Sequence, residues 1–567
     1  MNTGFSIIDY LIFGLYALTI IGIGLYVSRQ KKGVSKTSED YFLAGKSLPW
    51  WAVGASLIAA NISAEQMIGM SGSGFAIGLA IASYEWMAAI TLLIVGKYFL
   101  PIFLKQGIFT IPEFLEQRYG KTLKSILAVF WISLFVFVNL TSVLYLGALA
   151  LDTILGTGDG SLVIIAIIGL GLFTAIYSLW GGLSAVAWTD VLQVFLLILG
   201  GLITAFIALD HIAPNGGVWE GLKVLYEKVP EKFSMILEKG ELFMPDGRDA
   251  WWDLPALSVL IGGMWVANLY YWGFNQYIIQ RTFAAKSLKE AQKGIVFAAG
   301  LKLIIPLIVV IPGIIAFVLN TDAAGMLTTD SVNDAFLKAN GSIDNDRAYP
   351  WLINQFVPIG LKGLVLAALS AAIVSSLASM VNSTATIFTM DIYKPYINKT
   401  ASEKALVSTG RISALFALLI AGFIAPQLGN LPQAFQYIQE YTGIVSPGIL
   451  AIFILGLFWN KTTNKAAIWG AIAALPVALF FKAGSKDWFA HSFFAGLFPN
   501  LPWMDQMGYT FILIAVIIIA VSLIDGKGKI NPQGIQFKSK MFKTERSFDI
   551  GAIIIIAILV VLYVSFW

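Results

Sequence analysis

Fourteen stretches of the chain are long and apolar enough to cross a lipid bilayer, and this feature constrains the fold more than any other. A helix needs roughly 20 mostly apolar residues to cross the hydrocarbon core. Since lipid offers the backbone no hydrogen-bond partners, the chain is predicted to be an all-α membrane protein. The predicted spans lie at 5–27, 48–72, 76–101, 121–150, 161–179, 187–209, 252–280, 291–319, 353–391, 407–425, 433–458, 464–482, 507–524 and 548–566.

The composition excludes several other classes of protein. The chain is 58% hydrophobic and 12% charged, whereas soluble domains are about 45–50% apolar and about 25% charged. It contains no cysteine, and its two histidines, His211 and His491, lie far apart, which argues against disulfides, thiolate catalysis and metal-centre enzymology. The basic residues are dispersed among short loops, which argues against a nucleic-acid partner. The sequence therefore indicates a protein that is not an enzyme.

The loop charges predict an orientation. Positive residues are retained on the cytoplasmic side of a membrane, and alternate loops hold 26 Lys and Arg residues on one side against 9 on the other. The first span lacks a basic region before it and is followed by Arg29, Lys31 and Lys32, so we expect it to be retained. Both termini are predicted to be extracytoplasmic, in a multi-pass protein of the cell (cytoplasmic or inner) membrane.

Two spans are interrupted by polar segments, 59–66 and 266–276. Irregular backbone is tolerated in a membrane only where it lines a cavity or packs against protein. The interruptions begin two runs of five spans, and broken helices at corresponding positions of two halves indicate a transporter site between inverted repeats. A polar helix end at the membrane surface is the alternative for the first segment.

This organisation predicts five regions. They are an extra helix and cytoplasmic loop (1–47), a first repeat (48–209), an extracellular loop (210–251), a second repeat (252–458) and C-terminal flanking helices (459–567).

Of the charged residues inside predicted spans, five are candidates for a functional site: Glu65, Glu85, Asp190, Lys302 and Glu440. Such residues cost about 2.5–3.5 kcal/mol each on insertion scales, so they normally face a cavity or a partner. Their number favours a solvated site. Glu65 and Glu440 have an alternative structural role, in which they bond backbone donors that a helix break exposes.

Several ordered blocks of the sequence resemble the sodium:solute symporter family, and within it the sodium/galactose and sodium/glucose transporters. The blocks lie at 41–51, 61–66, 181–190, 268–281, 373–379 and 436–441. The resemblance implies a five-plus-five inverted-repeat (LeuT-like) core with flanking helices. It also implies a symporter that uses sodium to import a monosaccharide of the galactose or glucose type by alternating access.

A sodium site is predicted on the ninth span. Ala372, Ser375 and Ser376 lie at i, i+3 and i+4, on one helix face. Taken alone, such a pair of serines is typical of close helix packing. The resemblance implies that these three residues bind sodium together with the carbonyl groups of Ala59 and Ile62.

The resemblance also assigns Asp190 to sodium release or to a second ion site. Relatives with such a site use serines one turn further along the ninth span, where this chain has Ser379 next to Ala378. We therefore expect one sodium ion per transport cycle.

The sugar site implied by the resemblance combines hydrogen-bonding groups with an aromatic platform, as a pyranose requires. Glu85 and Lys302 can pair and leave the pocket close to neutral, which suits an uncharged solute. Ala88 replaces a serine of the family pattern, which leaves the preferred sugar open. The predicted contacts are Gln66, Glu85, Asn268, Tyr271, Trp272, Lys302 and Gln439, with Met70, Tyr84 and Phe435 as the outer gate.

Other functions stay open at this point. The solute could be an inositol, a sialic acid or an amino acid, although Glu85 argues against a carboxylate solute. A membrane sensor that binds its ligand without transporting it is a second class. An intramembrane hydrolase is disfavoured because Ser, Asp and His residues do not converge in the sequence. The expected partners are the monosaccharide and the lipid bilayer, and the expected assembly is a monomer or weak homo-oligomer.

Overall fold

The computed structural model describes residues 5–567 except 30–35, 156–159, 215, 323–326, 328–330, 338–340, 431–433, 487, 489–497 and 537–538. Side chains at 28, 177, 180, 181, 429, 430, 434–437 and 539 also lie outside the description. Within the described part, β structure is confined to isolated bridges between single residues, and the prediction of an all-α protein is confirmed.

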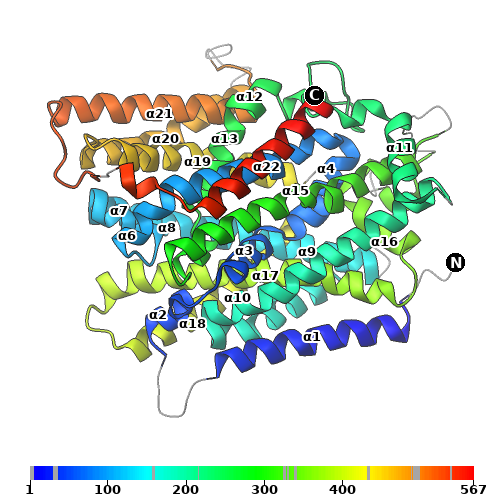
Figure 1. Ribbon diagram of the computed structural model, residues 1–567, viewed down its shortest axis with the longest axis horizontal. Helices are drawn as coiled ribbons and strands as arrows, with labels where there is room; N and C mark the ends of the chain where they lie inside the picture. Colours follow the sequence, from blue (N-terminus) through cyan, green and yellow to red (C-terminus); the bar gives the residue numbers. More distant parts are fainter. Residues whose placement is uncertain are drawn as a thin grey trace.

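The α-helices run mainly along the long axis of the molecule (Figure 1). In chain order they are α1 (Ile7–Ser28), α2 (Ser38–Leu43), α3 (Trp50–Asn61), α4 (Ser71–Ala76), α5 (Ser83–Ile94), α6 (Leu100–Gln106), α7 (Ile111–Tyr119), α8 (Lys121–Leu134), α9 (Thr141–Leu155), α10 (Val163–Ile212), α11 (Gly217–Lys228), α12 (Ala256–Ile261), α13 (Gly263–Phe274), α14 (Gln276–Phe283), α15 (Leu288–Leu319), α16 (Ala348–Phe356), α17 (Leu361–Ile387), α18 (Glu403–Ile424), α19 (Ala434–Phe458), α20 (Asn464–Ser485), α21 (Trp503–Asp525) and α22 (Arg546–Ser565).

Eleven helices of the described part are long and apolar enough to cross a membrane, and they match eleven of the fourteen predicted spans. Of the others, 48–72 and 252–280 are interrupted, and 161–179 forms the first half of α10. The total of fourteen and the relation between the two repeats stay predictions.

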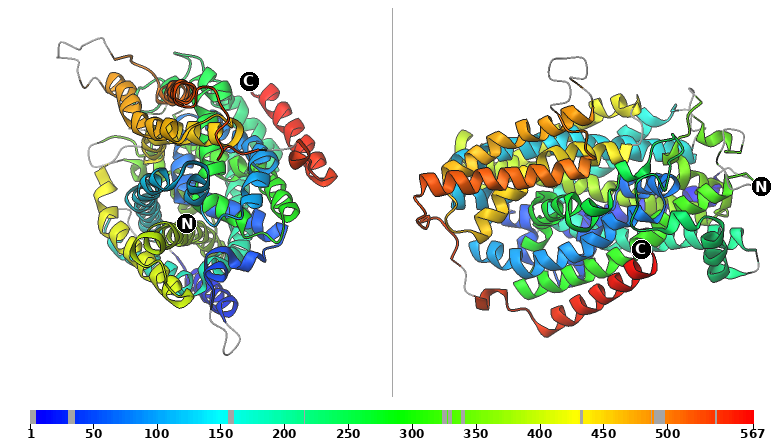
Figure 2. Two further views of the ribbon diagram at one scale, coloured as in Figure 1. Left: turned by 90° about the vertical axis from the view of Figure 1, so that its left-hand side faces the viewer. Right: turned by 90° about the horizontal axis from the view of Figure 1, so that it is seen from above.

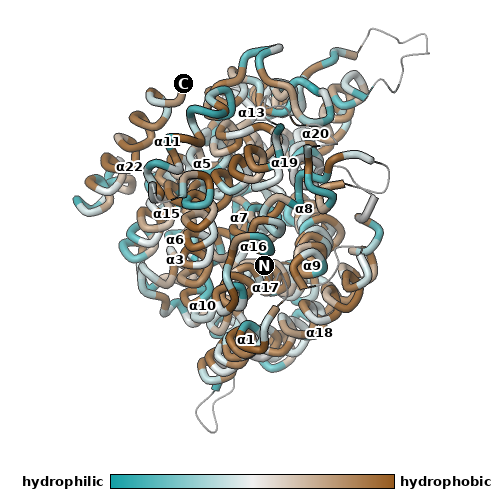
Figure 3. Tube along the Cα trace, turned by 90° about the vertical axis from the view of Figure 1, so that its right-hand side faces the viewer, coloured by the Kyte–Doolittle hydropathy of each residue, from teal (hydrophilic) through white to brown (hydrophobic). Residues whose placement is uncertain are grey.

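The outermost helices expose apolar side chains, as lipid contact requires. Leu18 of α1 and Ile553 of α22 are 71% and 67% exposed, and both helices lie at the periphery and are largely hydrophobic (Figure 3). Exposed apolar surface on this scale is typical of a face that meets lipid or a partner. The two sets of loops lie at opposite ends: the N-terminus, α11 and α16 at the right of Figure 1, and α2 and α7 at the left. Which end faces the cytoplasm stays a prediction.

Helix α17 lies at the centre of the bundle, surrounded by other helices (Figure 2). In its most apolar stretch, 94% of the residues are buried. It packs against α10. Small residues allow this approach: a Cβ atom at Gly200 would lie 2.7 Å from that of Ala368. Within α10, two helices meet at Gly182, whose φ of 64° favours glycine. A Cβ atom there would lie 2.3 Å from the carbonyl oxygen of Tyr41. The chain therefore turns between the predicted spans 161–179 and 187–209.

Candidate ion and solute sites

The first interruption lies at the end of α3. This helix ends at Asn61, and Ile62 adopts an extended conformation (φ −80°, ψ 111°) before the π-helical segment Glu65–Met70 continues the path. The prediction of a break within 59–66 is confirmed. A helix end leaves its last carbonyl groups without intrahelical partners. These carbonyls are therefore available as ligands inside the bundle.

Ser376 of α17 faces these carbonyl groups. Its hydroxyl oxygen lies 3.4 Å from the carbonyl oxygen of Ala59, 3.1 Å from that of Ala60 and 3.3 Å from that of Ile62, and all are buried. One hydroxyl hydrogen cannot satisfy three acceptors. Oxygen lone pairs therefore converge here, as a hard cation prefers. Ala59, Ile62 and Ser376 meet as the predicted ion site requires, and Ala60 was not predicted.

The structure does not bring the whole predicted ion set to one point. Ser375 donates its hydroxyl hydrogen to Asp190 Oδ1 at 2.6 Å instead of contacting α3. Ala372 lies one turn before Ser376 on α17 and is buried. The two adjacent serines thus serve different neighbours, and the assignment of sodium to these residues stays a prediction.

Asp190 lies in a second, charged cluster. It is fully buried and accepts hydrogen bonds from the hydroxyls of Ser56 and Ser375. The Arg281 guanidinium lies 3.9 Å from Asp190 Oδ2, donates to Ser56 Oγ at 3.2 Å, and donates to Ser379. Arg281 is one of the 26 basic residues that the sequence assigns to loops, and this assignment is wrong, because Arg281 is buried on α14. The guanidinium therefore balances the carboxylate charge.

The second interruption separates α13 from α14. Asn275 has an extended backbone (φ −84°, ψ 117°) between Phe274 and Gln276. The break thus falls inside the predicted segment 266–276, next to a run of aromatic and amide residues.

The two interruptions border one cavity with a volume of about 70 Å³. Met70 and Tyr84 of the predicted gate line it, as does Ala88, whereas the side chain of Phe435 lies outside the described residues. That these residues bind a solute stays a prediction. All seven predicted solute contacts line this cavity: Gln66, Glu85, Asn268, Tyr271, Trp272, Lys302 and Gln439.

Lys302 organises one side of the cavity. Its ammonium group bonds Glu85 and the side-chain oxygen of Asn61, and both charged side chains are buried. The ammonium also lies 5.0 Å from the ring centroid of Trp272. A buried charge requires such a partner. The Glu85 and Lys302 charges therefore cancel, as the sequence predicts.

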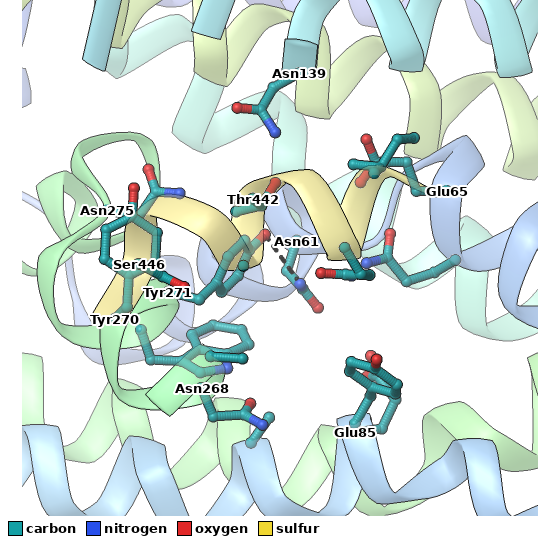
Figure 4. Close-up of a pocket in the computed structure, with 18 of the residues that line it drawn as sticks. Asn61, Glu65, Glu85, Asn139, Asn268, Tyr270, Tyr271, Asn275, Thr442 and Ser446 are labelled. Carbon is teal, nitrogen blue, oxygen red and sulfur yellow. Dashed lines mark hydrogen bonds between the residues drawn. The ribbon is translucent and has the colours of Figure 1, made fainter. Parts of the chain in front are cut away.

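Tyr271 is held by residues from both interruptions. Its hydroxyl accepts a hydrogen bond from Asn61 Nδ2 at 3.1 Å, drawn as a dashed line in Figure 4, and one from the Tyr277 hydroxyl at 2.7 Å. Its ring meets that of Trp272 edge to face, with centroids 5.2 Å apart. The aromatic platform is therefore linked directly to the end of α3.

Gln66, and not Glu65, satisfies the backbone at the first break. Gln66 Oε1 accepts from the backbone N–H and the hydroxyl of Ser63, both at 3.0 Å. Glu440 pairs with Lys482 and Lys486. The structural alternative, in which these two carboxylates bond freed backbone donors, is therefore not what the described residues show.

Sequence reasoning missed several residues of the cavity wall. Thr442 and Ser446 follow Gln439 at i+3 and i+7 on α19, so one polar helix face was the signal that could have revealed them. The residues not predicted as contacts are Asn61, Glu65, Leu134, Asn139, Ala267, Tyr270, Asn275, Tyr277, Ile438, Thr442, Gly443, Ser446 and Met507.

Comparisons with known proteins give a consistent result. Residues 41–474 match the model of the sodium:solute symporter family. The chain is 58% identical over 564 residues to the sodium/glucose cotransporter of Vibrio parahaemolyticus, covering 100% of this chain and 99% of that protein. It is 35% identical to the human sodium/myo-inositol cotransporter 2, covering 83% of this chain and 69% of that protein.

Among solved structures, the fold is similar to that of a Na⁺-coupled sialic acid symporter, with a TM-score of 0.74 at 22% identity. The likeness covers 94% of this chain and 99% of the other. It concerns the arrangement of helices, and it agrees with the predicted transporter fold.

Proposed function

Because the chain belongs to the sodium:solute symporter family, we propose that it imports a monosaccharide of the galactose or glucose type together with sodium, by alternating access. The family makes it a multi-pass membrane transporter and not an enzyme. The high identity to a protein named sodium/glucose cotransporter supports a sugar as the solute.

One observation carries the proposal: the end of α3 contributes to both sites. The carbonyls of Ala60 and Ile62 contact Ser376, while the side chain of Asn61 between them lines the cavity and bonds Tyr271 and Lys302. An ion at Ser376 would fix the backbone that positions Asn61. Binding at each site then strengthens binding at the other, since such coupling is reciprocal.

The cavity suits an uncharged, hydroxyl-rich solute on its Lys302 side. Glu85, Asn268 and Gln439 offer hydrogen-bond partners, and Tyr271 and Trp272 offer apolar ring surface for the C–H face of a pyranose. Gln66 would exchange its Ser63 contacts for a sugar hydroxyl. Met70 and Tyr84 would close the outer side, together with Phe435.

We propose that one sodium ion binds between Ser376 and the end of α3, with Ser375 and Ala372 completing the site in the ion-bound state. A second ion at Asp190 and Ser379 is disfavoured, since the Arg281 guanidinium already contacts both groups. Asp190 would instead lie on the route of release.

The energetics of this scheme suffice for accumulation. One charge moving through 100 mV releases about 2.3 kcal/mol, and a tenfold sodium gradient about 1.4 kcal/mol more. The sum of about 3.7 kcal/mol would support concentration of a neutral sugar by roughly several hundredfold.

Uptake of labelled galactose and glucose into proteoliposomes tests the proposal. We expect uptake under an inward sodium gradient and none when choline replaces sodium. Lys302→Ala should abolish uptake, since it leaves Glu85 buried without its partner. Equal uptake in choline would refute symport.

Competition by myo-inositol, a sialic acid and amino acids would identify another solute. Counterflow in the same vesicles separates a transporter from a sensor, because a sensor binds the solute without exchanging it.

A further inference from the structure

The cavity has a second polar wall that the proposed sugar contacts do not use. In the view of Figure 4, Asn139, Thr442 and Glu65 lie on the upper side, opposite Glu85 and Asn268 on the lower side. We refer to Glu65, Asn139 and Thr442 as the upper wall. These residues come from three separate elements: the π-helical segment after α3, the segment Phe135–Leu140 before α9, and α19.

The upper wall consists of acceptors without partners. Glu65 Oε1, Asn139 Oδ1 and Thr442 Oγ1 are buried and have no hydrogen-bond partner in the described part of the chain. Asn275 Oδ1 and Ser446 Oγ share this property and line the same cavity. Glu65 and Asn139 are 8% and 7% exposed. Buried polar groups are nearly always paired, so five such atoms around one cavity favour the binding of a polar ligand there.

The charges of the cavity indicate the sign of that ligand. Its charged lining residues are Glu65, Glu85 and Lys302, and Lys302 is already bonded to Glu85 and Asn61. Among the described lining residues, Glu65 is therefore the charged group without an ion-pair partner. A buried carboxylate without such a partner takes up a proton, whereas a cation beside it keeps it ionised.

The usual structural explanation for Glu65 does not apply. Its position after a helix break would allow it to bond freed backbone N–H groups, but Gln66 accepts the hydrogen bond from Ser63 instead. Glu440, in the second turn of α19, shows the contrast, because two lysines compensate it.

We propose that the upper wall is a subsite for a monovalent cationic group. A single carboxylate with neutral amide and hydroxyl oxygens matches a hard monovalent cation or an ammonium group, whereas divalent ions usually require more carboxylates. No group of three or more His, Cys, Asp or Glu able to hold a metal occurs among the described residues. The group is either a sodium ion or the protonated amine of an amino hexose.

Sodium binding to the purified protein tests the first source and does not depend on sugar transport. Ser376→Ala weakens the proposed sodium site, so an ion held by the upper wall should contribute most of the remaining binding of radioactive sodium. Adding Glu65→Gln to Ser376→Ala should weaken that residual binding by about tenfold or more, as expected for loss of a charged contact. Glu440→Gln is the matched control, and adding it to Ser376→Ala should leave the residual sodium binding unchanged.

Competition against labelled galactose tests the second source. If the subsite binds an amine, protonated galactosamine should displace labelled galactose at a concentration about tenfold lower than neutral N-acetylgalactosamine requires. Glu65→Gln should abolish that preference while galactose still binds. Asn139→Ala should reduce the preference in the same direction, since it removes one neutral oxygen.

A selective effect of Glu65→Gln in either assay supports the subsite and identifies its ligand. If Glu65→Gln folds normally and changes neither residual sodium binding nor the amine preference, the proposal is wrong. The subsite can fail while sodium-driven galactose uptake persists, so its failure is distinct from failure of the proposed function.

Discussion

Adjacent serines of α17 serve two oxygen-rich centres of opposite character. The carbonyl centre comprises Ser376 and the carbonyl groups of Ala59, Ala60 and Ile62. The carboxylate centre comprises Ser375, Asp190, Ser56, Arg281 and Ser379. The first centre contains no formal charge, whereas the second contains a carboxylate and a guanidinium.

The difference shows that a carboxylate is a poor guide to an ion site. Asp190 attracts attention in the sequence, but Arg281 already provides its positive partner. The carbonyl centre has converging oxygens and no cation among the described side chains. We therefore expect sodium binding to depend on the carbonyl centre, and the stability of the folded protein to depend on the carboxylate centre.

Arg281→Met should have the largest effect. Removing one partner of a buried ion pair costs about 3–5 kcal/mol, so the melting temperature of the purified protein should fall steeply in choline. If sodium takes the vacant place beside Asp190, high sodium should restore part of that loss. Arg118→Met is the control, because the partners of Arg118 in the described part of the chain are backbone carbonyls at and after the end of α19. Sodium should not restore the melting temperature of Arg118→Met. Equal recovery in both variants would contradict a specific sodium effect beside Asp190.

Ser56→Ala should have the next largest effect. Its hydroxyl donates to Asp190 and accepts from Arg281, and hydrogen bonds to charged groups contribute about 1.5–3 kcal/mol. Thermal unfolding should show this loss, while the sodium concentration for half-maximal uptake stays unchanged. Thr91→Val is the matched control, since the buried Thr91 hydroxyl donates to the Met87 carbonyl of its own helix. A shift in sodium dependence alone would place Ser56 in the ion site instead.

Ser376→Ala should weaken sodium binding by about tenfold, or about 1.4 kcal/mol, with little loss of stability. The hydroxyl is the side-chain oxygen that faces the carbonyls of α3, so the sodium concentration for half-maximal galactose uptake should rise. Ser370→Ala is the control, because Ser370 is buried on the same helix and its hydroxyl has no partner in the described chain. An unchanged sodium dependence in Ser376→Ala would remove the carbonyl centre as the ion site.

The sequence predicted the carbonyl centre better than the carboxylate centre. A polar run inside an apolar span is a local signal, so the break after Asn61 could be placed to within a few residues. The partner of Asp190 has no such signal. Arg281 is 91 positions away in the chain and follows an apolar span, where a basic residue is typical of a loop.

The cavity shows the same limit. Charge and residue type indicated Glu85 and Lys302 as a pair, but not that Asn61 would join them. Glu65 and Gln66 are neighbours with similar side chains, and only the fold determines which of them satisfies the helix break. Contacts between distant elements depend on packing, which a pattern along one helix does not contain.

Ser379→Ala should have the smallest effect and decides the number of ions. Ser379 donates to the carbonyl of Ser375 at 2.7 Å and accepts from Arg281, so its loss should cost about 1 kcal/mol in thermal unfolding. If Arg281 excludes an ion from the carboxylate centre, Ser379→Ala should leave the Hill coefficient for sodium unchanged. A coefficient near two that falls to one in Ser379→Ala would mean that sodium competes successfully with the guanidinium. Both centres would then hold an ion, and the contrast between them would depend on the state of the transport cycle.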